Sequence, residues 1–247
     1  HEIYSALGFE KQDWPLLAVL VPYTLLIMLS SYSVCRAMVM PASFLVVLFY
    51  AIYLVVRNGV ISYQKASGLA MFSGIVIFCF YSFIRLKEML PVEEYGYDAI
   101  FFILLILCFA WGGDTCAYFA GRAFGKHKLC PVVSPKKTVE GAVGGVLGTM
   151  VFGVLVTVIY SIAADRMEEF TRSNIGVSMY VIIALLACVA AVLGIYGDLF
   201  ASVVKRQCGI KDYGTIFPGH GGILDRFDSV MFIAPFVTMV VIAAFYD

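Results

Sequence analysis

The chain has 247 residues, of which 62% are hydrophobic and only 14% charged, and its formal net charge at pH 7 is zero. A mean hydropathy of +0.92 is far above that of ordinary soluble domains and predicts an integral membrane protein. Without a basic excess, nucleic acid is not an expected partner. The seven cysteines form no CxxC pair or Cys/His cluster, so we interpret them as small core residues rather than a zinc or disulfide site.

Apolar runs of membrane-spanning length recur along the chain, since a helix needs about 20 apolar residues to cross a bilayer. The runs lie at 14–33, 38–56, 66–84, 99–120, 140–164, 175–204 and 229–246. They predict an all-α polytopic membrane protein, a bundle of about seven transmembrane helices, or eight or nine. The run from Ile175 is either one long tilted helix or two helices broken near Gly194 and Gly197. The chain begins at His1 without a signal-peptide pattern, so a missing N-terminus with a further span stays open.

The charges of the connecting segments orient this bundle. Residues 121–139 carry five basic side chains and no acid, which is typical of a cytoplasmic loop. Alternation from there places 205–228 on the same face and the acidic 88–98 segment outside. We divide the chain into N-terminal transmembrane helices, 1–100, and a C-terminal transmembrane region, 101–247, which includes the polar segment 202–228 and is the candidate catalytic region.

Five glycines between residues 141 and 153 predict a helix face for close packing. They are Gly141, Gly144, Gly145, Gly148 and Gly153.

Four aspartates lie within or at the ends of apolar spans: Asp114, Asp198, Asp225 and Asp228. An ionised side chain at the bilayer centre costs about 2.5 to 3.5 kcal/mol, so such residues usually carry function. On a helix, Asp198, Ser202 and Lys205 would share one face. Converging carboxylates suit a hard cation such as Mg²⁺. Intramembrane salt bridges to Lys205, Arg206 or Arg226 explain the same residues equally well.

Basic groups supply a second polar element. The segment from Ser134 to Thr138 (Ser-Pro-Lys-Lys-Thr) is expected to join the basic side chains of 205–226 on one face, where lysine, arginine and glycine N–H groups suit phosphate oxygens. The alternative is a solvated lysine cluster at anionic lipid. His220, between glycines, is a candidate general base, a phosphate donor or a simple loop residue. No Walker A loop or GxGxxG motif is present.

The segment 202–228 reads Ser202-x-Val204-Lys205-Arg206-x4-Lys211-Asp212-x-Gly214-x2-Phe217-Pro218-x-His220-Gly221-Gly222-Ile223-x-Asp225-Arg226-Phe227-Asp228. This pattern resembles the complete signature of the phosphatidate cytidylyltransferases, also called CDP-diacylglycerol synthases. Asp114-Thr-x2-Tyr118-x2-Gly121 and Ser134-Pro-Lys-Lys-Thr138-x-Glu140-Gly141 resemble that family too, so the likeness spans roughly residues 110–230.

The resemblance implies a nucleotidyltransferase of phospholipid biosynthesis that converts CTP and phosphatidic acid to CDP-diacylglycerol and pyrophosphate. It implies that Mg²⁺ is the cofactor, with a K⁺ ion beside it. It also implies a homodimer among membrane lipids. The expected location is a bacterial inner membrane, with the active site facing the cytoplasm. The metal ligands that the resemblance implies are Asp198, Asp225 and Asp228. The expected catalytic residues are these three aspartates together with Lys205 and Arg206. The expected substrate-binding residues are Asp114, Ser134, Lys136, Lys137, Thr138, Ser202, Lys211, Asp212, His220, Gly221, Gly222 and Arg226.

Three other functions compete with this interpretation. A transporter or channel would use Asp114 and Asp198 as an ion path, but the inverted repeat it predicts is absent from the sequence. A membrane phosphotransferase acting on a CDP-alcohol would carry a run of aspartates and glycine on one helix, which is also absent. A relative that uses another lipid, such as an isoprenoid ether phosphatidate, stays open, as do acyl-chain preference and the choice between CTP and dCTP.

Overall fold

The computed structural model describes residues 1–166, 176–217 and 221–245. Within these residues, five helical segments are long and apolar enough to cross a membrane, and a sixth apolar helix is shorter. The five are α3 (Ser33–Val56), α4 (Tyr63–Met89), the continuous segment Asp98–Phe124, α8 (Val139–Arg166) and α9 (Val177–Gln207); the shorter helix is α11 (Val230–Phe245). An α-helical integral membrane protein is confirmed, whereas the count of seven to nine spans is not.

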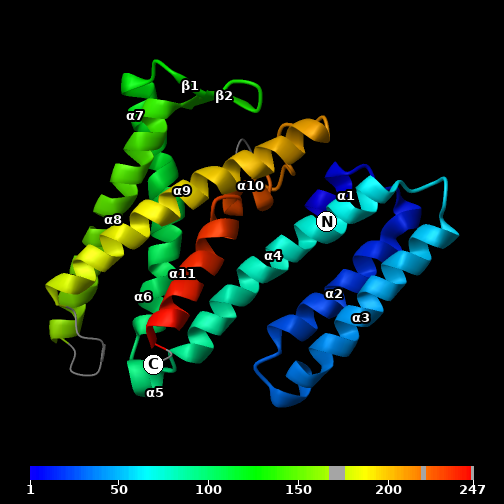
Figure 1. Ribbon diagram of the computed structural model, residues 1–247, viewed down its shortest axis with the longest axis horizontal. Helices are drawn as coiled ribbons and strands as arrows, with labels where there is room; N and C mark the ends of the chain where they lie inside the picture. Colours follow the sequence, from blue (N-terminus) through cyan, green and yellow to red (C-terminus); the bar gives the residue numbers. More distant parts are fainter. Residues whose placement is uncertain (167–175, 218–220, 246–247) are drawn as a thin grey trace. The chain divides into compact units, whose positions relative to one another are not determined.

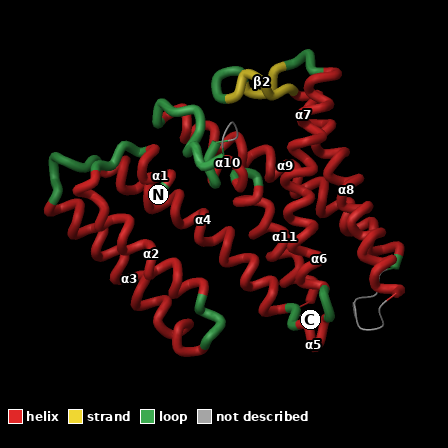
Figure 2. Tube along the Cα trace, turned by 180° about the vertical axis from the view of Figure 1, so that it is seen from behind, coloured by secondary structure: helices red, strands yellow, loops and turns green. Residues whose placement is uncertain are grey.

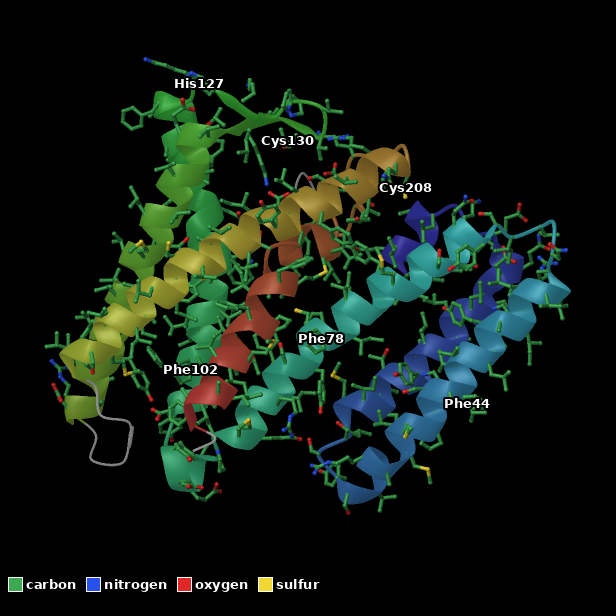
Figure 3. The ribbon with its side chains drawn as sticks, in the orientation of Figure 1. Phe44, Phe78, Phe102, His127, Cys130 and Cys208 are labelled. Atoms are coloured by element: carbon green, nitrogen blue, oxygen red, sulfur yellow. The ribbon has the colours of Figure 1, made fainter. Side chains whose placement is uncertain are left out.

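The spanning helices present large apolar side chains outward, as lipid contact requires. Phe44 on α3 is 66% exposed and Phe78 on α4 is 55% exposed, and both are labelled in Figure 3. In α3, Tyr50 is the single buried residue. Most of its other residues are exposed, and the remainder are half-buried.

The chain forms two compact units, whose bounds differ from the division into 1–100 and 101–247 made from the sequence. The first unit contains 1–81 and 207–226, and the second contains 82–206 and 227–247. Most of the signature segment thus packs with the N-terminal helices. The contact of the Tyr213 ring with Phe72, 5.6 Å between centroids, is one reason.

The first unit is built on α2 (Trp14–Met28) and α3, which run side by side (Figure 1). The Tyr50 hydroxyl donates to the Leu16 carbonyl at 3.0 Å. Before α2 lie α1 (Glu2–Ala6) and the 3-10 turn η1 (Lys11–Asp13), and the first part of α4 completes the helices. An ion pair of 3.1 Å between Arg57 and Asp13 ties the end of α3 to η1.

The second unit is organised by a close helix pair. The segment Asp98–Phe124 consists of α6 (Asp98–Leu107), the π-helical turn η2 (Cys108–Gly112) and α7 (Gly113–Phe124), and it packs along α8; the short helix α5 (Val92–Tyr95) precedes it. A Cβ added at Gly144 would overlap Ala120, and one at Gly148 would overlap Cys116. The predicted packing face is confirmed. This face is covered within the chain, and the homodimer stays a prediction from the resemblance.

We expect Gly144→Ala to lower the free energy of unfolding by about 1–3 kcal/mol, because its methyl group would push α7 from α8. The matched control is Gly74→Ala on α4, where nothing lies within 4 Å of the added Cβ. That change should be neutral or stabilising by up to about 1 kcal/mol, since alanine is the better helix former. Thermal unfolding in detergent measures both, and equal melting temperatures would contradict the packing.

A hairpin that the sequence analysis did not predict connects α7 to α8 (Figure 2). Strands β1 (Lys128–Cys130) and β2 (Ser134–Thr138) are antiparallel, with Lys128 opposite Thr138 and Cys130 opposite Ser134. The Thr138 hydroxyl accepts the Gly141 N–H at 3.1 Å and so caps α8. The basic segment is therefore a folded element joined to a helix.

Helix α9 is one continuous helix of 31 residues (Figure 1), so the alternative of two helices broken near Gly194 and Gly197 is wrong. The glycines instead admit another chain segment. A Cβ at Gly197 would lie 2.6 Å from the Asp228 carbonyl oxygen, and one at Gly194 would lie 2.9 Å from the Ile233 side chain. This close approach brings the end of the signature against the middle of α9.

Candidate functional site

The polar face of α9 forms one wall of the candidate site in the second unit. The Ser202 hydroxyl donates to Asp198 Oδ1 at 3.3 Å, which confirms that the two residues share a helix face. Ser202 and Lys205 are each 9% exposed. A lysine this buried is unusual unless its charge is matched by nearby acids.

The second wall is the turn between α10 (Leu224–Phe227) and α11. Asp228 is 8% exposed and its Oδ1 accepts the Ser229 N–H at 2.9 Å. The Ser229 hydroxyl donates to Asp114 Oδ2 at 3.1 Å. Ser229 was missed as a site residue, although its place directly after Asp228 was a usable signal.

Asp114 lies in the first turn of α7, directly after η2. Single π-helical turns within helices are frequent at functional sites because they reorient the residues that follow. Gly113 allows this segment to touch α8, since a Cβ there would lie 2.6 Å from Thr149 Oγ1. A void of about 20 Å³ beside Asp114 and Ser229 has room for a water but not for a nucleotide.

Like charges crowd this site. The pKa of the Asp228 carboxyl is raised to about 7, first by burial and then by the charges of Asp198 and Asp114, while Lys205 and the hydrogen bond from the Ser229 N–H act in the opposite direction. The three carboxylates are thus close enough to repel one another. Within the described residues, however, no group of three or more His, Cys, Asp or Glu side chains is gathered as metal ligands.

The hairpin adds basic groups to the same site. Lys137 forms an ion pair with Asp198. The sequence analysis had considered Lys205, Arg206 and Arg226 as partners of the aspartates, but not Lys137. Arg206 donates from Nε to the Val133 carbonyl at 3.4 Å. Ser134 is half-buried and Lys136 is exposed on the hairpin, and the Thr138 hydroxyl serves the cap of α8.

The signature loop in the first unit has its own internal order. Asp225 Oδ2 accepts the N–H groups of Tyr213 at 2.8 Å and Gly222 at 2.9 Å. Gly221 has a φ of +85°, which favours glycine, and a Cβ there would lie 2.7 Å from the same carboxylate oxygen. The Gly222 N–H, expected to face phosphate, is therefore taken by Asp225.

Glu2 also holds this loop, and no sequence signal pointed to it. Its carboxylate accepts the N–H groups of Ile223 and Leu224, both at 2.8 Å. A residue more than 200 positions away thus fixes the loop just before Asp225.

Several predicted residues lie at the surface or outside the described part of the chain. Lys211, Asp212 and Arg226 are exposed. His220 lies outside the described residues. Asp225 belongs to the first unit while Asp198 and Asp228 belong to the second, so their joint role as metal ligands stays a prediction.

Comparison with known proteins gives a family match over nearly the whole chain. A model described as "Cytidylyltransferase family" matches residues 1–244. A protein named phosphatidate cytidylyltransferase from Bacillus subtilis (strain 168) is 32% identical over 191 residues, which are 77% of this chain and 64% of that protein. Proteins of the same name from Staphylococcus epidermidis (strain ATCC 12228) and Staphylococcus aureus (strain COL) are 42% and 39% identical over 145 residues, 59% of this chain and 50% of each relative. The chain thus spans less than two thirds of each of these relatives.

Proposed function

Since this chain belongs to the cytidylyltransferase family, we propose that it transfers the cytidylyl group of CTP to phosphatidic acid, giving CDP-diacylglycerol and pyrophosphate. The observation that supports this most strongly is the buried cluster of Asp228 and Lys205 beside Asp198 and Asp114. Such a cluster has no structural necessity in an apolar bundle and offers both signs of charge that a nucleotide–metal complex requires.

In the proposed reaction, an oxygen of the phosphatidate phosphate attacks the α-phosphorus of CTP. The bond from the α-phosphorus to the oxygen that bridges it to the β-phosphorus breaks, and pyrophosphate leaves with that electron pair. Phosphatidate is already ionised near neutral pH, so no strong general base is needed. The protein therefore contributes mainly positioning and charge neutralisation.

Magnesium is supported by the type of donor and not by a ligand set gathered among the described residues: Asp198 and Asp114 act on Asp228 through their charges, and carboxylate oxygens are the ligands that Mg²⁺ prefers. Asp198 and Asp228 would hold the ion, and Asp225 remains a metal ligand only as an expectation from the resemblance. When bound, Mg²⁺ supplies charge neutralisation at the phosphate oxygens. A neighbouring K⁺ remains a prediction from the resemblance.

The basic side chains would hold the phosphates. Lys205 lies buried among the acids, and Lys137 reaches Asp198 from the hairpin. Arg206 and Lys136 extend the positive charge along the exposed side of the same unit. We propose that this rim binds the triphosphate and the lipid phosphate.

The basic hairpin also supports the proposed orientation. Its lysines predict a cytoplasmic location, and Lys137 connects it directly to Asp198. We propose that the site faces the cytoplasm of a bacterial inner membrane, where CTP enters from water and the lipid from the bilayer.

Position-specific labelling of CTP tests the reaction. With phosphatidic acid and Mg²⁺, α-labelled CTP should place its label in a chloroform-soluble lipid, whereas γ-labelled CTP should release it as pyrophosphate. Label in the lipid from γ-labelled CTP would instead indicate phosphate transfer and overturn the proposal. Transfer only to another lipid acceptor would correct the substrate and retain the chemistry.

We expect Asp225→Asn to lower kcat by at least about 100-fold while the melting temperature stays nearly constant. The amide oxygen can still accept the N–H groups of Tyr213 and Gly222, so the loop keeps its fold and only the charge is lost. Asp225→Ala removes these hydrogen bonds as well and should lower both kcat and stability. If Asn and Ala variants lost stability equally and kept turnover, Asp225 would be a structural residue only.

A further inference from the structure

The first unit contains an apolar groove of about 710 Å³ that the proposed reaction has not used. It is formed by α1, α2, α4 and the signature loop. Its walls include Leu17, Leu20, Val76, Ile77, Ile223 and Leu224. This volume falls within the range of about 300–1,000 Å³ typical of ligand sites.

One end of the groove is part of the signature loop. Ile216, Ile223 and Leu224 line it there, and the N–H groups of Ile223 and Leu224 bind the Glu2 carboxylate. Asp225 follows directly. The groove therefore has a polar end at residues tied to the proposed chemistry and an apolar remainder along two helices.

The length of the groove matches one leaflet of a bilayer. Its wall on α2 extends from Leu17 to Met28, which is about 16 Å along the axis at a rise of 1.5 Å per residue. Half of a hydrocarbon core about 30 Å thick is about 15 Å. A fatty acyl chain whose headgroup lies at the signature loop would occupy this length.

A second groove in the same unit provides a contrast. It has a volume of about 540 Å³ and lies between α2 and α3, with Val46 among its lining residues. None of the signature residues that the structure describes lines it. Any membrane lipid can cover such a surface. The first groove differs because its apolar wall continues into the signature loop.

We propose that the groove of α1, α2 and α4 holds an acyl chain of the phosphatidate substrate and so places the lipid at the signature loop. This inference rests on the proposed function. It assigns acyl-chain recognition to Leu17, Leu20, Val76 and Ile77, none of which the signature contains.

Chain-length dependence tests the assignment. Val76→Trp fills the groove from α4, and Val46→Trp makes the same change in the second groove; both valines are half-buried. With dioleoyl phosphatidate in mixed micelles, Val76→Trp should raise KM about tenfold or more, while KM for dihexanoyl phosphatidate should change less than about twofold. Val46→Trp should change neither. Equal effects of the two variants, or equal effects on both lipids, would overturn the proposal.

Crosslinking of the unmodified chain provides a readout that does not depend on a variant's folding. A phosphatidate with a diazirine at mid-chain should label peptides of α2 and α4 at the first groove, and unlabelled phosphatidate, but not phosphatidylcholine, should compete. Labelling without that selectivity, or equally at the second groove, would assign bulk lipid and refute the proposal. Absence of turnover by the unmodified chain with any phosphatidate would refute the proposed function instead, and selective labelling would still report the groove.

Discussion

Asp228→Asn is expected to lower kcat/KM for the proposed reaction by about 1,000-fold or more without lowering stability. Asp228 is buried beside Asp198 and Asp114, and its pKa is raised to about 7. In the absence of a cation, the ionised carboxylate is therefore disfavoured in the folded state. The amide keeps the shape of the side chain and removes the repulsion, but it cannot supply the negative charge that the proposed magnesium site requires.

The raised pKa of Asp228 also predicts how the stability of the folded chain changes with pH. The pKa of Asp228 rises on folding, from the usual 3.8 to about 7, so its contribution to stability is present below about pH 4 and is lost as the pH rises through about 7. In magnesium-free buffer, the melting temperature of Asp228→Asn relative to the unmodified chain should therefore increase between pH 5 and pH 8. A difference that stays constant with pH would show that folding does not raise the pKa of Asp228.

Asp13→Asn is the matched control. Asp13 is also buried, but it forms an ion pair with Arg57 at 3.1 Å, and its carboxylate raises the pKa of that guanidinium. Removing one member of such a pair destabilises a protein. Asp13→Asn should therefore lower the melting temperature and keep turnover, the opposite of Asp228→Asn. If both variants lost stability and both kept activity, the Asp228 cluster would be an ordinary structural ion pair.

Lys205→Met should lower kcat/KM by about 100-fold or more, because the buried ammonium would no longer neutralise phosphate charge. It should also destabilise the second unit, since Asp228 loses the positive charge that opposes its raised pKa. Lys65→Met is the control, because Lys65 is exposed and its Nζ donates to the Gly8 carbonyl at 3.2 Å. That change should affect neither quantity strongly.

The double variant Lys205→Met/Asp228→Asn separates the two effects. With neither charge left unpaired, the double variant should recover much of the stability lost by Lys205→Met. It should remain inactive. Recovery of turnover together with stability would mean that Lys205 acts only by stabilising the fold.

The sequence predicted the helices and the polar face of α9 because periodicity and hydropathy are local properties. It also placed Asp198, Ser202 and Lys205 together. It did not predict the hairpin, whose short strands depend on the cap at Thr138 and on Glu140, which accepts the N–H groups of Lys126 and His127. Such side chain to backbone contacts leave no periodic pattern.

Long-range contacts account for the other differences. Gly194 and Gly197 suggested a helix break, but their role depends on Asp228 and Ile233, which lie more than 30 residues further along the chain. Glu2 binds the signature loop across more than 200 residues. A single sequence gives no signal for either pairing, because both depend on tertiary packing.

Pyrophosphate release tests the central claim most directly. The purified chain is supplied with CTP, Mg²⁺ and phosphatidic acid, each is omitted in turn, and Asp228→Asn and Asp13→Asn are assayed in parallel. We predict release that requires all three components and is lost in Asp228→Asn but kept in folded Asp13→Asn. Release that continues without phosphatidic acid, or that survives in Asp228→Asn, would contradict a cytidylyl transfer carried out at the carboxylate cluster of the second unit.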